Sequence, residues 1–144
     1  MAPSDDDLRR LLTGARTIAV VGLSDKPERD SNEVARYLQS VGYRVIPVNP
    51  MLTEVLGETS YPSVTTVPPG VTIDILDIFR RSDQVAPVVA EGLERGVGSI
   101  WMQLGVENPE AATSAEARGV PVVQNLCIMV QHRRLRIPPK SSAG

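Results

Sequence analysis

The sequence contains a single cysteine, Cys127, among its 144 residues. One thiol cannot form an intrachain disulfide, and such sparse use of cysteine is typical of proteins that work in a reducing compartment. The first residues are acidic, so they lack the basic segment and apolar core of a secretory signal. Together these features predict a cytoplasmic protein.

A charge imbalance and long apolar runs are also missing. The formal net charge is −2 and 22% of the residues are charged, so the composition gives no reason to expect a nucleic-acid partner. No apolar run approaches the roughly 20 residues that a membrane helix needs. The chain is long enough for one hydrophobic core, and we therefore expect a single domain over residues 1–144.

No catalytic or metal-binding pattern can be assembled from the sequence. His132 is the only histidine, and no spacing of His, Cys, Asp and Glu matches a metal site. Asp74 and Asp77 are three apart in an expected strand, so they should point to opposite faces and cannot act as a carboxylate pair. We therefore expect neither catalytic residues nor a bound metal.

The sequence does contain a regular alternation of apolar runs and segments with helical periodicity. This alternation predicts an α/β fold, a doubly wound parallel sheet of five strands that is Rossmann-like. The strands are expected at residues 18–21, 44–48, 71–79, 99–102 and 120–123, and the helices at about 4–13, 31–42, 86–95, 109–118 and 126–134.

Two stretches lack this patterning. The proline-rich crossover at residues 50–70 is expected to hold at most one helical turn, at residues 53–56. Such a long crossover is either functional or a wrap over the edge of the sheet. The tail at residues 136–144 is expected to be frayed.

The strand, loop and helix at residues 17–38 form the most informative stretch. A short run rich in β-branched residues ends at Gly22, which predicts a buried parallel strand. Asp30 followed three residues later by Glu33 is typical of a capping box, so a helix should start near Ser31. The loop that joins the two elements is polar.

This loop, at residues 23–30, predicts an anion site. It brings the Ser24 hydroxyl and the Lys26 and Arg29 cations to the N-terminus of a helix, where main-chain amides attract negative charge. A dinucleotide fingerprint is missing, because Ser24 replaces its second glycine and the strand at 44–48 ends without an acid. NAD is therefore disfavoured, and the cations favour a ligand with more phosphate charge. The alternative is an ordinary exposed loop whose charges are solvated.

Other candidates lie where the expected strands end, because doubly wound sheets bind ligands at that edge. Arg80 and Arg81 directly follow the third expected strand, so at least one guanidinium should face this edge and form paired hydrogen bonds with phosphate, or both are surface arginines. Phe79 can lie under a purine or belong to the core, and Asn49 can bind adenine or ribose or simply form a turn. Gln103 is polar where the chain leaves the fourth strand. Cys127 begins the last helix, as a reactive thiol or an inert core cysteine.

Several short motifs spread along the chain point to a known family. They are IAVVGLS at 18–24, the Lys-Pro-x-Arg loop at 26–29, Ser31-Asn32, VIPVNP at 45–50, DIFRRS at 77–82 and WMQLGV at 101–106. In combination they resemble the family of small stand-alone CoA-binding domains. That family is similar to the Rossmann-type CoA-binding domain of the succinyl-CoA synthetase α subunit, without the second domain that carries a phosphorylated histidine.

The resemblance implies a coenzyme A site at the carboxyl edge of the sheet. By this likeness the phosphates would lie at Gly22, Leu23, Ser24, Lys26 and Arg29 with Ser31 beside them, the nucleotide near Asn49, Pro50, Phe79 and Arg80, and the pantetheine near Met102 and Gln103. Related sequences often have a charged pair just before the cysteine. This chain has Gln124, Asn125 and Leu126 there, which weakens any role that depends on charges beside the thiol.

We therefore predict a protein that binds coenzyme A or an acyl-CoA and acts as a non-catalytic or accessory module. The alternatives are an NAD(P)-linked oxidoreductase and an accessory subunit that completes an acyl-CoA ligase. Neither a nucleic acid nor a membrane is an expected partner, and a protein partner remains open. Cys127 adds a redox hypothesis, in which a bound CoA forms a mixed disulfide with its thiol.

Overall fold

Five parallel strands form one sheet, in the order β2-β1-β5-β6-β7, in the computed structural model, which describes residues 2–140. The strands are β1 (Thr17–Val21), β2 (Arg44–Val48), β5 (Ile75–Ile78), β6 (Ile100–Met102) and β7 (Val122–Val123). The chain moves outward from β1 to β2 and then crosses back to β5, so the strand order reverses beside β1. The expected doubly wound α/β fold is confirmed, and its carboxyl edge beside β1 is where such sheets bind ligands.

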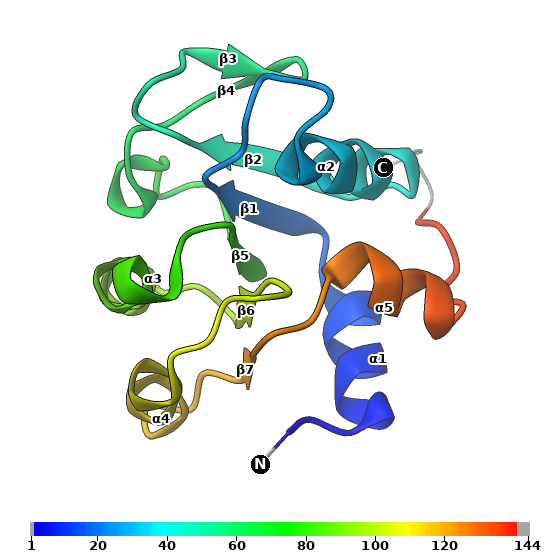
Figure 1. The fold of residues 1–144 in the computed structure, drawn as a ribbon, viewed down its shortest axis with the longest axis vertical. Helices are drawn as coiled ribbons and strands as arrows, with labels where there is room; N and C mark the ends of the chain where they lie inside the picture. Colours follow the sequence, from blue (N-terminus) through cyan, green and yellow to red (C-terminus); the bar gives the residue numbers. More distant parts are fainter. Residues whose placement is uncertain (1, 141–144) are drawn as a thin grey trace.

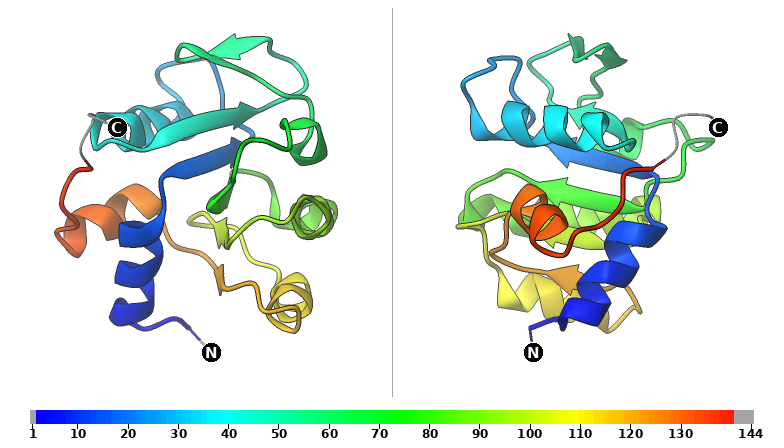
Figure 2. Two further views of the ribbon diagram at one scale, coloured as in Figure 1. Left: turned by 180° about the vertical axis from the view of Figure 1, so that it is seen from behind. Right: turned by 90° about the vertical axis from the view of Figure 1, so that its right-hand side faces the viewer.

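Helices cover both faces of the sheet (Figure 1). One face carries α1 (Asp5–Gly14), α2 (Asp30–Ser40) and α5 (Ile128–Arg134), and the other carries α3 (Val85–Arg95) and α4 (Pro109–Glu116). Figure 2 shows the same layers from behind and from the side. None of the helices formed by residues 2–140 combines the length and apolar character that a membrane crossing requires.

Alternation along the strands divides the core into two layers. Val20, Ile75 and Trp101 pack in the layer under α1, α2 and α5. Leu76 and Ile100 pack in the layer under α3 and α4. Because both faces of the strands are buried, the strands are mainly apolar runs in the sequence, with Asp77 in β5 as a buried exception. We call the two layers the α2/α5 layer and the α3/α4 layer.

Several element boundaries differ from those expected. The third strand of the chain to join this sheet begins at Ile75 instead of residue 71, because the Asp74 carboxylate accepts hydrogen bonds from the main-chain nitrogens of Arg16 (2.9 Å) and Thr17 (3.0 Å). The last strand is limited to residues 122–123, and α5 begins at Ile128 with Cys127 as its N-cap.

The capping box expected at the start of α2 is wrong. Arg29 is the N-cap of this helix, and within the described residues no side chain caps it. Asp30 is instead its first residue, where a negative charge favours the helix dipole. The N-cap expected at Ser4 is confirmed, and it forms a capping box with Asp7.

The single helical turn expected at residues 53–56 is also wrong. β3 (Glu54–Val55) and β4 (Glu58–Thr59) pair as an antiparallel hairpin, and a short 3-10 helix, η1 (Val64–Thr66), follows. The hairpin turn at Leu56 and Gly57 has positive φ at both residues, 53° and 81°, a geometry that glycine favours. A bridge between Val48 and Tyr61 joins the crossover to the edge of the sheet beside β2.

The tail is not frayed over residues 136–140. Ile137 is 7% exposed and packs in the α2/α5 layer. The main-chain nitrogen of Lys140 donates to the Val41 carbonyl at 2.8 Å, and its ammonium donates to the Thr13 carbonyl at 2.6 Å. These long-range contacts hold the segment against the ends of α1 and α2. The rest of the expected tail, 141–144, lies outside the described residues.

Candidate functional site

A polar hollow of about 630 Å³ lies at the carboxyl edge of the sheet, between the loop after β1 and the start of α2. In Figure 1 this loop projects from β1 toward the β3-β4 hairpin. The hollow is lined by Gly22, Ser24, Lys26, Glu28, Arg29, Asp30, Ser31 and Phe79. Most of the residues expected at the phosphates therefore come together in one place.

Two buried side chains of α2 hold this loop in shape. The hydroxyl of Ser31, which is 6% exposed, accepts a hydrogen bond from the Ser24 main-chain nitrogen at 3.0 Å. The amide of Asn32, which is 2% exposed, donates to the Ser24 carbonyl at 2.8 Å. The Ser24 hydroxyl in turn accepts from the Lys26 nitrogen at 3.1 Å. Ser31 is thus a positioning residue, and Asn32 is a second one; the sequence pointed to this pair only as one of the family motifs.

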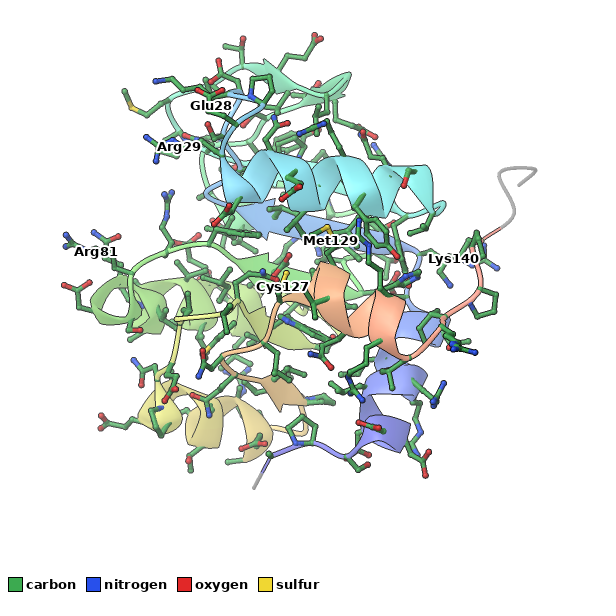
Figure 3. All side chains as sticks on the ribbon, turned by 45° about the vertical axis from the view of Figure 1, so that its right-hand side comes forward. Glu28, Arg29, Arg81, Cys127, Met129 and Lys140 are labelled. Carbon is green, nitrogen blue, oxygen red and sulfur yellow. The ribbon has the colours of Figure 1, made fainter. Side chains whose placement is uncertain are left out.

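The charges at the polar hollow are mixed but unpaired. Lys26 and Arg29 are exposed, and within residues 2–140 neither forms an ion pair. Glu28 and Asp30 line the same hollow, so its cations are partly balanced. Figure 3 shows Glu28 and Arg29 side by side on the loop above α2.

Arg80 supplies a further cation from the end of β5. Its Nη1 lies 3.3 Å from the point where a Cβ on Gly22 would stand, so the guanidinium reaches the loop after β1. The next residue, Arg81, forms an exposed ion pair with Asp83 at 3.2 Å. In Figure 3 Arg81 extends from the molecule at the end of the β5 segment. Of these two arginines, Arg80 therefore lies beside Gly22, a residue that lines the polar hollow.

An apolar hollow of about 530 Å³ continues from the polar one, and both share Asp30 and Phe79. Its remaining lining is mainly apolar: Val34, Leu104, Val106, Cys127, Met129 and Val130, with Glu33, Arg80, Arg81 and Gln103 among them. Cys127 and Met129 come from the start of α5 and are labelled in Figure 3. Phe79 therefore lies where the two hollows meet, and together we call them the groove.

Gln103 brings one fixed polar group to the apolar hollow. The residue is 4% exposed, and its Oε1 accepts a hydrogen bond from the Ile128 nitrogen at 3.0 Å. Among the described residues its amide nitrogen has no protein partner, although the residue lines the hollow. The bond to the start of α5 thus orients the amide and leaves its N–H groups for a ligand.

Four of the expected site residues do not line the groove. Met102 is 0% exposed and packs in the α3/α4 layer, on the far side of the sheet. The Leu23 side chain is 0% exposed in the opposite layer. Asn49 donates to the Leu23 carbonyl at 3.0 Å and accepts from the Met51 nitrogen at 2.9 Å, so its amide shapes the edge of the sheet. Pro50 is exposed beside it.

His132 is a core residue and not a site residue. It is 2% exposed, and its Nδ1 lies 2.6 Å from the Tyr37 hydroxyl. Burial lowers its pKa, which favours the neutral imidazole. Within the described residues, no three His, Cys, Asp or Glu side chains gather as a metal site requires.

Comparison with known proteins agrees with this geometry. Residues 16–133 match the family model described as CoA binding domain. The chain belongs to the CoA-binding domain family. The protein YneT of Bacillus subtilis (strain 168) is 40% identical over 130 residues, which cover 90% of this chain and 95% of YneT. The resemblance that the sequence motifs suggested is therefore confirmed.

Similar solved structures include a small protein of about the same extent and part of a much longer chain. A hypothetical protein from Pyrococcus horikoshii OT3 is 40% identical, with a TM-score of 0.88 over 93% of each chain. The dinucleotide forming acetyl-coenzyme A synthetase 1 of Ca. Korarchaeum cryptofilum is 29% identical, with a TM-score of 0.67. That match covers 81% of this chain but only 27% of the synthetase.

Gly22 gives a direct test of the geometry at the groove. It has φ of 85°, and a Cβ there would stand 2.2 Å from the Phe79 carbonyl oxygen. Gly57 has a similar φ of 81° but open space around it, which makes it the matched control. Alanine at either site costs about 1 kcal/mol from backbone strain. We expect only Gly22→Ala to lose a further 1–3 kcal/mol or so of unfolding free energy, because its new Cβ would overpack against the Phe79 carbonyl.

Urea unfolding of the two variants measures this difference. The free energy of unfolding should fall clearly more for Gly22→Ala than for Gly57→Ala. Equal losses would show that β1 and β5 can separate at this point without cost.

Proposed function

We propose that this protein binds coenzyme A, or an acyl-CoA, along the groove, with the phosphates in the polar hollow and the pantetheine arm in the apolar hollow. The observation that carries the proposal is the continuity of the two hollows at Phe79. A cationic end followed by an apolar channel matches a ligand that has phosphates at one end and a long, mostly apolar arm at the other. Membership of the CoA-binding domain family supports the same ligand.

The cations favour the phosphate-rich end of this ligand. Lys26 and Arg29 line the polar hollow, and Arg80 lies beside Gly22 and lines the adjoining apolar hollow. Among the described residues none of the three forms an ion pair. Coenzyme A carries a 3′-phosphate in addition to its diphosphate, so it offers more negative charge than NAD. Guanidinium groups bind phosphate oxygens through paired hydrogen bonds.

The apolar hollow suits the pantetheine arm. This arm is a chain of methylene and methyl groups interrupted by two amides, so it needs apolar contact with a few polar partners. Phe79, Val106 and Met129 supply the contact, and the free amide nitrogen of Gln103 supplies a hydrogen-bond donor. The thiol end would then lie near Cys127.

The NAD(P)-linked alternative has less support. The loop after β1 has one glycine where a dinucleotide fingerprint has three. The end of β2, where an acid would bind the ribose, holds Asn49 instead, and its amide is engaged with Leu23 and Met51. An accessory role beside an acyl-CoA ligase remains the second candidate, because the matching region is 27% of the Korarchaeum synthetase chain.

Ligand preference is the first test. We expect coenzyme A to bind more tightly than dephospho-CoA, by about fivefold, because one phosphate contact at a partly exposed site contributes about 1 kcal/mol. NAD should bind far more weakly than either. Isothermal titration calorimetry with the three ligands measures these affinities. Equal affinity for coenzyme A and NAD would overturn the proposal.

The loop cations can be tested one at a time. Lys26→Ala and Arg29→Ala should each weaken coenzyme A binding about fivefold and make its affinity less sensitive to salt, since each removes one exposed charge contact. Their melting temperatures should stay close to that of the unaltered protein, because both side chains lie on an exposed loop.

Two control variants test whether the change in coenzyme A affinity follows the charge at the polar hollow. Glu28→Gln removes a negative charge from the same hollow, so it should strengthen binding. Arg118→Ala removes an exposed cation just after α4, remote from the groove, and should leave the affinity unchanged. Equal weakening by Arg118→Ala would show that only the overall charge matters.

Cys127 gives a separate prediction about redox chemistry. It lines the apolar hollow beside Met129, so the thiol end of a bound ligand can come within reach. With CoA disulfide as the oxidant, the Cys127 thiolate would attack one sulfur, form a mixed disulfide and release one CoA thiol. Intact-mass spectrometry should show one CoA adduct that dithiothreitol removes and that Cys127→Ser lacks. An unmodified protein would rule out this step and leave reversible binding unaffected.

A further inference from the structure

Asp77 is a buried acidic residue whose burial lowers the stability of the core. It lies in β5 between Leu76 and Ile78 and is 0% exposed. Neither of its carboxylate oxygens has a hydrogen-bond partner among the residues that the structure describes. A buried polar group without a partner destabilises a fold, and valine would suit this strand position better. Such a residue calls for an explanation beyond packing.

The burial of Asp77 determines its chemical form. In the α2/α5 layer an ionised carboxylate would lose its hydration, and this burial raises the pKa of Asp77 well above its ordinary value. Burial therefore favours the neutral carboxylic acid over the carboxylate. In this form it offers one O–H donor, which a carboxylate lacks.

The position of Asp77 links it to the groove. Alternation along β5 places it on the same face as Ile75, in the α2/α5 layer, and its register partners are Val20 and Trp101. Two residues further along β5, on this same face, comes Phe79, which lines both hollows. A strand advances roughly 6.6 Å over two residues, so Asp77 lies one layer beneath the floor of the groove.

The neighbouring strand shows the same layering. Trp101 is the register partner of Asp77 in β6, and two residues later comes Gln103, which lines the apolar hollow. The Trp101 indole nitrogen donates to the Leu126 carbonyl at 2.8 Å, directly before Cys127. Phe79 and Gln103 thus form the floor above Asp77, at the end of the groove where Cys127 lies.

We propose that Asp77 is a concealed hydrogen-bond donor for the thioester carbonyl of an acyl-CoA, which reaches it by displacing the Phe79 ring. The inference rests on the proposed function, since it takes the thiol end of the ligand to lie near Cys127. A carbonyl oxygen is the acceptor that a neutral carboxylic acid can satisfy, and free CoA has no such group on its sulfur. The register neighbours of Asp77, Val20 and Trp101, are apolar, so an acyl group that reaches Asp77 should be small and uncharged.

The experiment compares two ligands that differ only in this carbonyl. Acetyl-CoA has a thioester C=O where S-ethyl-CoA has a methylene group, and both share every other contact. We expect the unaltered protein to bind acetyl-CoA about five- to tenfold more tightly than S-ethyl-CoA, the range of one net hydrogen bond. Calorimetry of both ligands gives this ratio directly.

Three variants test whether Asp77 causes the preference for acetyl-CoA over S-ethyl-CoA. Asp77→Val removes the donor and should bring the ratio to about one, while its melting temperature rises because a buried orphan group is gone. Asp77→Asn keeps an N–H donor and should retain part of the preference. Ile75→Val trims the same face of β5 one step further from the groove and should leave the ratio unchanged.

The outcomes separate this inference from the proposed function. If coenzyme A binds but the ratio is one in the unaltered protein, or is unchanged in Asp77→Val, the role of Asp77 is overturned and coenzyme A binding stands. If none of the CoA ligands binds, the proposed function fails, and the role of Asp77 fails with it.

Discussion

The close approach of β1 and β5 at their carboxyl ends is the constraint on which the groove depends. Gly22 lets the Phe79 carbonyl come where a side chain would otherwise stand, 2.2 Å from the position of a Cβ. The same approach sets the Phe79 ring between the polar and apolar hollows and brings the Arg80 guanidinium over the loop after β1. One missing methyl group thus allows two strand ends and a loop to share a single binding surface.

Buried polar residues behave in two different ways in this protein. Ser31, Asn32 and Gln103 are nearly inaccessible, and each is bonded to a main-chain group of the loop or helix that it positions. These bonds fix the loop after β1 and the start of α5 before any ligand arrives, which reduces the ordering cost of binding. Asp77 is equally buried but has no partner within the described part of the chain. Only the satisfied residues are explained by the fold itself.

The comparisons place this chain in a family whose domain occurs in two settings. It stands alone in the Pyrococcus horikoshii protein, and it is one part of a larger acetyl-coenzyme A synthetase in Ca. Korarchaeum cryptofilum. A binding domain that recurs with and without further domains is consistent with a site that is complete within one sheet edge and its loops. In this chain both hollows are indeed built from residues of a single sheet, its connecting loops and the starts of α2 and α5.

The sequence alone determined the alternation of strands and helices, the polar character of the loop at residues 23–30 and the family, because these depend on local periodicity and short motifs. The sequence-based predictions were wrong where a segment is held by contacts with residues far away in the chain. The tail at 136–140 is held by Val41 and Thr13, and the crossover forms a hairpin against the edge of the sheet. Strand order and register decide which side chains at the strand ends line the groove, and they also place Asp77 beneath it. The sequence does not show this order or register, because they bring together residues that are remote in the chain.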